Sequence, residues 1–450
     1  MMNHYDIAYG LGVAASAPYW LINRKARRKV KGAFSNRMGT QPVVGTRDLT
    51  KPAVLIHAVS VGEINATRTL VQRLQDARPD VQCIISVTTD SGFDQARQLY
   101  SGNTRVILIR YPLDFTSAVR RTLESLKPDL VVLMELELWP NFLRECQRRH
   151  ILVVLINGRL TSYSHRNYAM IKPIVSRMLK RLSRICVQDQ AYAEKFIDLG
   201  APPERVGVTG TMKFDTAQIT HRVDGDESLA TAVGLWPGAE PIWVCGSTGP
   251  GEEEIVLRVY RALLTKHSRL RLVIIPRKPE RFDEVARLIR QMRFDLTRRS
   301  SPNVTPGSTG LPAVVLGDTM GELRRFYSLS SIVFVGRTLV DLGPRQHGSD
   351  MIEPAALGRP VVLGPFTTNF ADAMKHFRAA AAMMEVSDEA TLGEAMNLLL
   401  LNGTQAASMA RRAQQVVIQQ QGATARHATL ILSGLPPRHP GQGGQSVKAK

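Results

Sequence analysis

A short run of apolar residues, Ala53 to Val59, leads directly into Ser60-Val61-Gly62-Glu63 and then into a helical pattern that ends near Leu74. A continuous apolar run of this length is typical of a buried parallel strand. The chain therefore predicts a strand, a turn that contains glycine, and the N-terminus of a helix. In open α/β sheets ligands bind beyond the carboxyl ends of the strands, so Glu63 is well placed to accept a proton from a ligand.

The same four residues also have a purely structural explanation. Ser60 and Glu63 match the S-x-x-E pattern of a capping box, in which two side chains satisfy the first amides of a helix. The spacing favours neither role over the other. Glu63 is therefore both a candidate base and a candidate helix cap.

The alternation of apolar runs and helical patterns extends from Pro52 to about Gly210, and a second alternation extends from Ile242 to Leu363. This rhythm is typical of doubly wound parallel sheets, so we expect an α/β protein. Two Rossmann-like domains that face one another across a cleft, the GT-B arrangement, fit the layout. The predicted parts are a membrane anchor with its basic flank (1–32), an N-terminal domain (40–215), an interdomain connection (216–240), a C-terminal domain (241–434) and a disordered tail (435–450).

The formal net charge of +19 points to an anionic partner. We find no zinc-finger spacing, no RNP-like aromatic motif and no DNA-reading element, and this argues against nucleic acid. An anionic membrane surface or a phosphorylated substrate fits better. The cysteines are scattered, and Cys83, Cys186 and Cys245 lie inside apolar runs, so we expect buried reduced thiols rather than disulfides or a metal site.

The N-terminus combines an apolar and aromatic stretch, Tyr5 to Ile22, with a cluster of Lys and Arg directly after it. A secretory signal carries its basic residues before the apolar region, so this order argues against export. The stretch is near the lower limit of about 17 residues for spanning a bilayer, and Tyr19 and Trp20 lie where interfacial aromatic residues are expected. We predict a short anchor or a monotopic membrane contact; a disordered basic leader is the alternative.

Polar segments follow strands in both predicted domains. Glu135-Leu136-Glu137-Leu138-Trp139-Pro140-Asn141 follows the strand Leu130–Met134, and two carboxylates in such a place are costly unless something uses them. The other segments are Asn157-Gly158-Arg159-Leu160, Gly210-Thr211-Met212-Lys213-Phe214-Asp215, Gly246-Ser247-Thr248 with Glu252-Glu253-Glu254, Pro276-Arg277-Lys278-Pro279-Glu280-Arg281-Phe282, Gly317-Asp318-Thr319-Met320-Gly321-Glu322-Leu323, Glu353-Pro354-Ala355-Ala356-Leu357-Gly358, Gly364-Pro365 and Asn369-Phe370.

In number, order and spacing these segments closely resemble the 3-deoxy-D-manno-octulosonic acid (Kdo) transferase family of lipopolysaccharide biosynthesis. The resemblance covers the chain from the N-terminal anchor to about residue 380. It implies a GT-B fold and transfer of Kdo from CMP-Kdo to a lipid A precursor, at the cytoplasmic face of the inner membrane, with the phospholipid surface as a further partner. It implies no metal and no cofactor, because CMP-Kdo is a substrate.

The resemblance also implies roles for single residues. Glu63 would deprotonate the acceptor hydroxyl as a general base, and direct displacement of CMP would invert the anomeric carbon. Glu135 and Lys213 correspond to positions with transition-state stabilising roles in the family. Taken alone, Lys213 would be an ordinary exposed lysine. The residues expected on the acceptor side are Ser60, Gly62, Glu137, Asn157 and Arg159.

On the donor side, Gly246-Ser247-Thr248 would offer backbone N–H groups and hydroxyls to a phosphate, and Arg277 would offer a bidentate fork. Glu353 would accept hydrogen bonds from the ribose hydroxyls. Without the resemblance, Arg277 would be a surface arginine and Glu353 an acid favoured by a helix N-terminus. The full expected donor set is Gly246, Ser247, Thr248, Pro276, Arg277, Asp318, Thr319, Met320, Gly321, Glu322, Asp350, Met351, Ile352, Glu353 and Asn369.

The chain departs from the family pattern at a few positions. The segment His347 to Pro354 reads His-Gly-Ser-Asp-Met-Ile-Glu-Pro where the family commonly has Gly-Gly-His-Asn-Pro-Leu-Glu-Pro. Lys278 replaces a usual His, and Arg337 replaces a Gly. The changed segment bears on CMP binding and on the choice of donor. The alternatives are therefore a GT-B transferase with a different nucleotide-sugar donor, such as a UDP-sugar, and a catalytically inactive GT-B scaffold.

Overall fold

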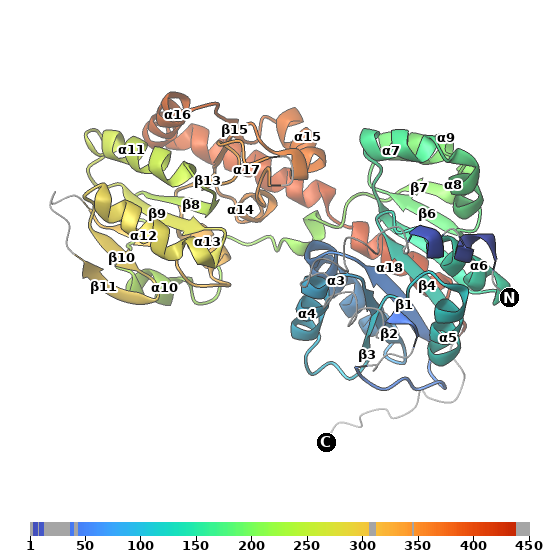
Figure 1. The fold of residues 1–450 in the computed structure, drawn as a ribbon. Helices are drawn as coiled ribbons and strands as arrows, with labels where there is room; N and C mark the ends of the chain where they lie inside the picture. The colour runs from blue at the N-terminus through green and yellow to red at the C-terminus, as the bar shows by residue number, and fades with distance from the viewer. Residues whose placement is uncertain are drawn as a thin grey trace, which may run out of the picture. The chain divides into compact units, whose positions relative to one another are not determined.

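The computed structural model describes residues 3–7, 9–12, 37–39, 44–305, 312–343 and 346–437. The chain divides into two compact units (Figure 1). Unit 1 takes the described residues of Met1–Thr216 and Gln421–Lys450, and unit 2 takes those of Ala217–Gln420.

Unit 1 is built on a parallel sheet with the strand order β3-β2-β1-β4-β5-β6-β7. Its strands are β1 (Ala53–Ala58), β2 (Gln82–Val87), β3 (Val106–Arg110), β4 (Leu130–Met134), β5 (Leu152–Gly158), β6 (Arg184–Val187) and β7 (Val206–Val208). Its helices are α3 (Val61–Ala77), α4 (Asp90–Leu99), α5 (Thr116–Leu126), α6 (Pro140–Arg148), α7 (Ser162–Ala169), α8 (Lys172–Leu179), α9 (Gln190–Asp198) and α18 (Ala423–Ser433).

Both faces of this sheet are covered by helices, so its strands are apolar on both sides. In β1, Val54 and Ile56 pack against α3, α4 and α18, whereas Leu55 packs on the opposite face against α5, α6, α8 and α9 (Figure 1). The period of two along a strand sends neighbouring side chains into different cores. This explains why the sequence shows a continuous apolar run rather than an alternation.

Unit 2 repeats the plan with the strand order β11-β10-β12-β9-β8-β13-β14-β15, in which β11 runs antiparallel to β10. Its strands are β8 (Ile242–Thr248), β9 (Arg271–Pro276), β10 (Leu296–Arg298), β11 (Ser301–Thr305), β12 (Val314–Leu316), β13 (Ile332–Val335), β14 (Val361–Leu363) and β15 (Met384–Glu385). Its helices are α10 (Asp226–Ala232), α11 (Glu252–Leu264), α12 (Phe282–Gln291), α13 (Leu323–Leu329), α14 (Ile352–Ala356), α15 (Ala371–Ala379), α16 (Glu389–Leu401) and α17 (Gly403–Gln420).

The prediction of an α/β protein with two doubly wound, mainly parallel sheets is confirmed. In each sheet the direction in which strands are added reverses once. In unit 1, β2 and β4 lie on either side of β1, and in unit 2, β9 and β13 lie on either side of β8. Ligands of open α/β sheets bind beyond the carboxyl ends of the strands at such switch points.

The border between the units differs from the predicted division at the connection 216–240. Residues 226–232 form helix α10, which packs on α13 within unit 2. The hydroxyl of Ser328 donates to the Asp226 carboxylate at 2.8 Å and ties the two helices together. The polar composition that suggested a free connection therefore reflects a surface helix.

The second difference is helix α18, which the prediction 241–434 assigned to the C-terminal domain. The helix packs on α3 in unit 1, and Ile431 is buried in the same core as Val54 and Ile56. The carboxylate of Asp215 accepts hydrogen bonds from the backbone N–H groups of Gly422 (2.6 Å) and Thr424 (2.5 Å), at the start of α18. This cap fastens the returning chain to unit 1. The predicted tail 435–450 lies outside the described residues from residue 438 onwards.

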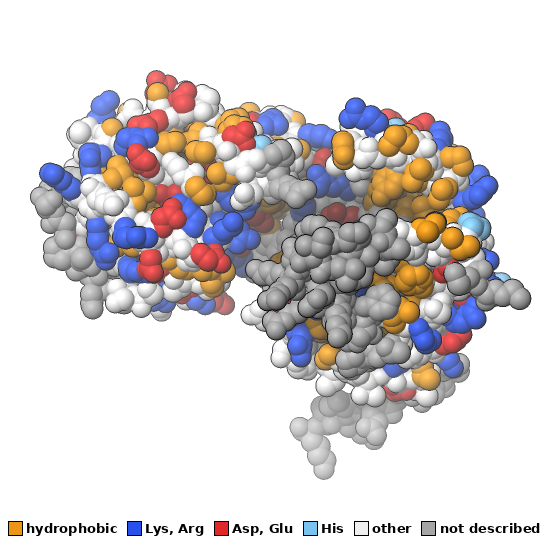
Figure 2. All heavy atoms as spheres, viewed as in Figure 1, with side chains coloured by type: hydrophobic (Ala, Val, Ile, Leu, Met, Phe, Trp, Pro, Cys, Tyr) orange, Lys and Arg blue, Asp and Glu red, His pale blue; other side chains and the backbone are white. Residues whose placement is uncertain are grey.

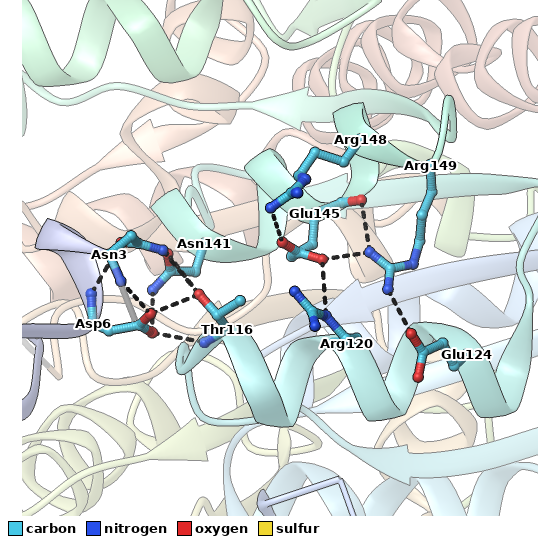
Figure 3. Close-up of polar contacts among 9 residues, drawn as sticks. All are labelled: Asn3, Asp6, Thr116, Arg120, Glu124, Asn141, Glu145, Arg148 and Arg149. Carbon is cyan, nitrogen blue, oxygen red and sulfur yellow. Dashed lines mark hydrogen bonds and ion pairs between the residues drawn. The ribbon is translucent and has the colours of Figure 1, made fainter. Parts of the chain in front are cut away.

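The described part of the predicted anchor 1–32 is docked on unit 1 through a buried polar cluster (Figure 3). The Asp6 carboxylate accepts hydrogen bonds from the backbone N–H of Thr116 at 2.7 Å, from its hydroxyl at 2.8 Å, and from the Asn141 side chain at 3.2 Å. Asn3 donates to Thr116 and Asn141, each at 2.9 Å. Residues 13–32 lie outside the described part of the chain. No helix among the described residues combines the length and the apolar character needed to cross a membrane.

The cysteine prediction is confirmed: Cys83, Cys146, Cys186 and Cys245 are all buried and none forms a disulfide.

Candidate active site

Side chains from three strand ends and one helix enclose a cavity of about 210 Å³ in unit 1. The loops after β1 and β4 contribute to it, and these two strands are adjacent at the switch point of the sheet. The loop after β5 and helix α7 complete the wall. The lining residues are Glu63, Glu135, Leu136, Glu137, Arg159, Thr161, Ser164 and Tyr168. Four predicted site residues, Glu63, Glu135, Glu137 and Arg159, are thus brought together from segments far apart in the sequence.

Glu63 occupies the third position of α3 and forms the predicted capping box with Ser60. Its carboxylate accepts hydrogen bonds from the backbone N–H groups of Val59 (2.9 Å) and Ser60 (3.2 Å) and from the Ser60 hydroxyl (2.7 Å). The Ser60 hydroxyl in turn accepts from the N–H of Glu63 at 3.3 Å. The structural explanation of this motif is therefore confirmed. The same carboxylate lines the cavity, so the cap fixes the orientation of a group that a bound molecule can reach.

Glu135 leaves β4 in a left-handed backbone conformation with φ of 57°. Its backbone N–H donates to the carbonyl of Ile156 at 3.0 Å, so the turn stays tied to β5. A residue with a Cβ adopts this conformation at a cost and keeps it only where its surroundings fix it. The turn places the Glu135 side chain in the wall of the cavity.

Glu137 is a partly buried carboxylate whose surroundings shift its pKa. Burial raises its pKa above the ordinary value, a hydrogen bond from the Trp139 indole at 3.2 Å lowers it, and the negative charges of Glu63 and Glu135 raise it. The net shift is upward. The cavity wall thus combines three carboxylates with the guanidinium of Arg159.

His57 lies behind Glu137 and was not singled out from the sequence, because it sits within an apolar strand. Its ring stacks on Tyr111, with ring centroids 3.9 Å apart, and Nδ1 donates to the carbonyl of Ser86 at 3.0 Å. Burial lowers its pKa to about 3, so the imidazole is neutral. Its Nε2 lies 4.0 Å from the Glu137 carboxylate. His57 Nε2 is buried and forms no hydrogen bond with a described residue.

The remaining predicted residues of this half, Ser60, Gly62, Asn157 and Lys213, lie outside the cavity wall. Asn157 is buried with φ of 52°, and its side-chain oxygen accepts from the backbone N–H of Met212 at 3.1 Å. It therefore holds the segment that carries Lys213. Lys213 and Gly62 are not among the residues that line the cavity. Thr161, Ser164 and Tyr168 line it but were missed, since no motif marks them.

In unit 2, the predicted phosphate segment Gly246-Ser247-Thr248 forms the buried end of β8. The backbone N–H of Arg277, directly after β9, donates to the carbonyl of Thr248 at 3.0 Å. Gly336, directly after β13, approaches the same segment so closely that a Cβ there would lie 2.5 Å from the Thr248 Cα. The loops after three adjacent strands therefore meet at the switch point of this sheet.

Glu252, the first residue of α11, holds these loops together. Its side chain is fully buried, and the carboxylate accepts from the backbone N–H groups of Gly249 (2.8 Å), Arg337 (2.6 Å), Thr338 (2.8 Å) and Leu339 (2.9 Å). Burial raises its pKa, although these hydrogen bonds lower it. One carboxylate thus joins the turn after β8 to the turn after β13.

The predicted donor residues after β12 form hydrogen bonds and ion pairs with residues 298–300, at the end of β10. The buried Asp318 carboxylate accepts from Arg298 Nε at 2.6 Å and from the Ser300 backbone N–H at 2.8 Å and hydroxyl at 2.5 Å. Burial raises the pKa of Asp318, but the hydrogen bonds from Ser300 and Arg298 together lower it by more, so the net shift is downward. Glu322 pairs with Arg299 and accepts from the Thr319 hydroxyl. Among these predicted residues, Met320 has an exposed side chain and Gly321 has open space around it.

The residues of the segment that opens α14 differ in exposure. The Met351 and Ile352 side chains are buried in the core, so they anchor the helix and only their backbone is available to a donor. Glu353 is partly exposed beside Asp350, with Arg324 Nε at 3.9 Å. Burial raises the pKa of Glu353 to about 7, and the Asp350 charge raises it while Arg324 lowers it. The backbone N–H of Asn369 donates to the His347 carbonyl at 3.3 Å, which places Asn369 beside the same loop.

No group of three or more His, Cys, Asp or Glu side chains in the described parts of the chain is arranged to hold a metal ion.

The sequence and the fold both match known proteins. Residues 32–216 match the family model of the 3-deoxy-D-manno-octulosonic-acid transferase, or kdotransferase. The 3-deoxy-D-manno-octulosonic acid transferase of Haemophilus influenzae is 34% identical over 379 residues, which cover 84% of this chain and 86% of that protein. The transferase of the same name from Bordetella pertussis is 30% identical over 429 residues, covering 93% of this chain and 96% of the relative.

Among solved structures, a putative UDP-N-acetylglucosamine 2-epimerase from Listeria monocytogenes matches with a TM-score of 0.55 at 14% identity, over 85% of this chain and 96% of that chain. This likeness concerns the fold alone. The chain belongs to the 3-deoxy-D-manno-octulosonic acid transferase family, and it is a glycosyltransferase.

Proposed function

We propose that this glycosyltransferase moves Kdo from CMP-Kdo to the lipid A precursor lipid IVA, without a metal and with inversion at the anomeric carbon. The reaction would serve lipopolysaccharide biosynthesis at the cytoplasmic face of the inner membrane. The observation that carries the proposal is the cavity of unit 1, where Glu63, Glu135, Glu137 and Arg159 converge at a switch point in a chain of this family.

In the proposed reaction Glu63 accepts the proton of the acceptor hydroxyl. The oxygen so released forms a bond to the anomeric carbon of Kdo, while the bond from that carbon to the phosphate oxygen breaks and CMP leaves with the electron pair. A positioned general base contributes typically about 10²–10⁴-fold to such a step. Glu135 would stabilise positive charge that develops on the sugar, and Lys213 would neutralise the sugar carboxylate or the leaving phosphate.

The surface next to the cavity supports an acceptor that carries acyl chains. Thr161, Ser164 and Tyr168 line the cavity, and the same helix-turn segment also bears large hydrophobic side chains that are exposed. Figure 2 shows hydrophobic side chains gathered over this part of unit 1. They are Tyr163, Met170, Ile171 and Ile174, and the exposed basic residues among them are Arg166, Lys172 and Arg177. Mixed apolar and basic surface suits an anionic lipid and an anionic membrane.

For the donor, we propose that unit 2 binds CMP-Kdo at the carboxyl ends of β8, β9 and β13, in a GT-B arrangement of the two units. Arg277 is exposed directly after β9 and would pair with the phosphate. Glu353 would accept hydrogen bonds from the ribose hydroxyls. The residues Gly246, Ser247 and Thr248 would line the phosphate side, and the 318–322 and 350–353 segments would complete the nucleotide contacts.

Incubation of the full chain with CMP-Kdo and lipid IVA, followed by mass spectrometry of the lipid, tests this proposal. We expect the lipid to gain the mass of one or more Kdo residues. A parallel incubation with UDP-sugars tests the alternative donor. Modification from a UDP-sugar, or no modification from any donor, would contradict the proposed reaction.

A further inference from the structure

Arg337, the second residue after β13, has an unusual backbone. Its φ of 61° lies in the left-handed region, where a side chain is unfavourable and glycine is the usual residue. Such strain persists only where the surrounding structure fixes it, and it is concentrated at functional sites.

Two backbone hydrogen bonds hold the residue on both sides. Its N–H donates to the buried Glu252 carboxylate at 2.6 Å, and its carbonyl accepts from the N–H of Gly348 at 2.6 Å. Because Glu252 also binds the amides of Thr338 and Leu339, the whole turn is fixed to the start of α11. The strained conformation is thus a stable part of unit 2.

The Arg337 side chain lies over the end of β8. Its Cγ is 3.0 Å from the point that a Cβ on Gly249 would occupy, and Gly249 directly follows Thr248. The carbonyl of Thr248 accepts the backbone N–H of Arg277 at 3.0 Å. Arg337 and Arg277 therefore flank the same strand end from opposite neighbouring strands.

The guanidinium groups of Arg277 and Arg337 form no ion pair within the described part of the chain. Arg337 Nε is buried there and has no hydrogen-bond partner. Burial lowers the pKa of Arg337, the nearby positive charge of Arg277 lowers it too, and Glu252 raises it. Two cations held close together with unused donors form a site for an oxyanion.

We propose that Arg337 is a second donor-binding arginine, which pairs with an oxyanion of the activated sugar while Arg277 pairs with another. The inference rests on the proposed function, because CMP-Kdo offers two such groups, the phosphate and the sugar carboxylate. Two guanidinium groups at one strand end favour a donor that carries both anions over a neutral-sugar nucleotide. Arg337 would thus contribute to the selection of an acidic sugar.

The test replaces Arg337 by glycine, which relieves the left-handed backbone and removes the guanidinium. Arg293→Gly is the matched control, because Arg293 also has φ of 61° but is exposed in the turn after α12. Both variants are expected to unfold at the same temperature as the wild type or higher. Titration calorimetry with CMP-Kdo and with CMP, without the acceptor lipid, then measures donor binding on the full chain.

We expect Arg337→Gly to bind CMP-Kdo at least tenfold more weakly than the wild type, and Arg293→Gly to bind it equally well. An equal loss for CMP identifies the phosphate as the partner of Arg337, and a loss for CMP-Kdo alone identifies the carboxylate. Unchanged affinity of Arg337→Gly for CMP-Kdo would overturn the inference and leave the proposed function intact. Failure of the wild type to bind CMP-Kdo would overturn both.

Discussion

Two carboxylates of the predicted donor site in unit 2 are held in different ways, and their pKa values shift in opposite directions. Asp318 accepts three hydrogen bonds from Ser300 and Arg298, so its pKa is lowered despite burial. Glu353 has only a distant arginine and a like charge nearby, so burial raises its pKa to about 7. Two carboxylates predicted for the same donor site therefore titrate in different ranges.

The pH dependence of CMP binding follows from Glu353. Its ionised form accepts hydrogen bonds from the ribose, so CMP affinity should rise as the pH increases through about 7 and level off above it. For stability the sign is opposite: the contribution of Glu353 is fully present below its ordinary pKa of 4.5 and is lost as the pH rises through about 7. Titration calorimetry of wild type and Glu353→Gln over this range checks the first effect.

The phosphate of CMP also titrates near pH 6. It does so equally for both proteins, so the difference between the two pH profiles isolates Glu353. Parallel profiles for wild type and Glu353→Gln would show that this carboxylate does not meet the nucleotide.

The sequence predicted the residues of unit 1 that line the cavity better than those of the donor side. Glu63, Glu135, Glu137 and Arg159 were predicted because each follows a strand, and strand ends of a parallel sheet meet at one edge. The sequence did not show that the side chains of Met351 and Ile352 are buried, because the motif gives their order but not their burial. His57 and Tyr168 carry no sequence signal, and Arg337 stood out only as a departure from the family pattern, since only the folded chain shows which groups face these residues.

At the scale of helices and strands, distant residues cap helix ends that their own sequence leaves uncapped. Neither Phe115 before α5 nor Trp139 before α6 supplies a side-chain cap. Asp6 instead binds the first amide of α5, and Asp114 binds the N–H groups of Asn141 (3.0 Å) and Phe142 (2.8 Å) at the start of α6. Sequence patterns could predict these helices but not their caps, because Asp6 is 110 positions from its partner.

Removal of the Asp6 cap should destabilise unit 1. Asp6→Ala leaves the amide and hydroxyl of Thr116 without their acceptor, so we expect a loss of about 1–2 kcal/mol in the free energy of unfolding. Asp76→Ala, at an exposed position on α3, is the matched control and should be nearly neutral. Urea denaturation of the full chain measures both; equal stability of the two variants would contradict a docked N-terminal segment.

At the scale of the whole molecule, the chain returns to its first unit at the end. The sequence located the first border within a few residues but not the return of α18, because a helix pattern does not show which sheet it covers. The basic charge predicted an anionic partner, yet only the structure locates the exposed hydrophobic residues on α7 and α8 beside the cavity. A cavity between α11 and α12 in unit 2 is lined by Glu253, Glu254, Glu284, Arg281 and Arg287, and the proposed reaction does not use it.

Recognition of the lipid by the exposed hydrophobic residues on α7 and α8 can be tested separately from recognition of the donor. The double variant Met170→Glu with Ile174→Glu places charges on the exposed apolar surface, so the KM for lipid IVA should rise several-fold while the KM for CMP-Kdo stays constant. Leu401→Glu, at an exposed leucine of α16 in unit 2, is the control and should leave both values unchanged. Steady-state kinetics with lipid IVA in detergent measures both constants. An unchanged KM for the lipid would exclude this surface from acceptor binding.

The central claim is that Glu63 takes the proton of the acceptor hydroxyl in addition to capping α3. Thr391 is a matched control, because it occupies the same third position in the capping box of α16 and accepts from the N–H of Asp388 at 3.1 Å. The decisive measurement is the turnover of CMP-Kdo and lipid IVA by Glu63→Gln and Thr391→Ala, with CMP-Kdo affinity measured on the same samples. The account predicts at least about a 100-fold loss for Glu63→Gln at unchanged donor affinity and full activity for Thr391→Ala. Turnover of Glu63→Gln close to that of the wild type would contradict it.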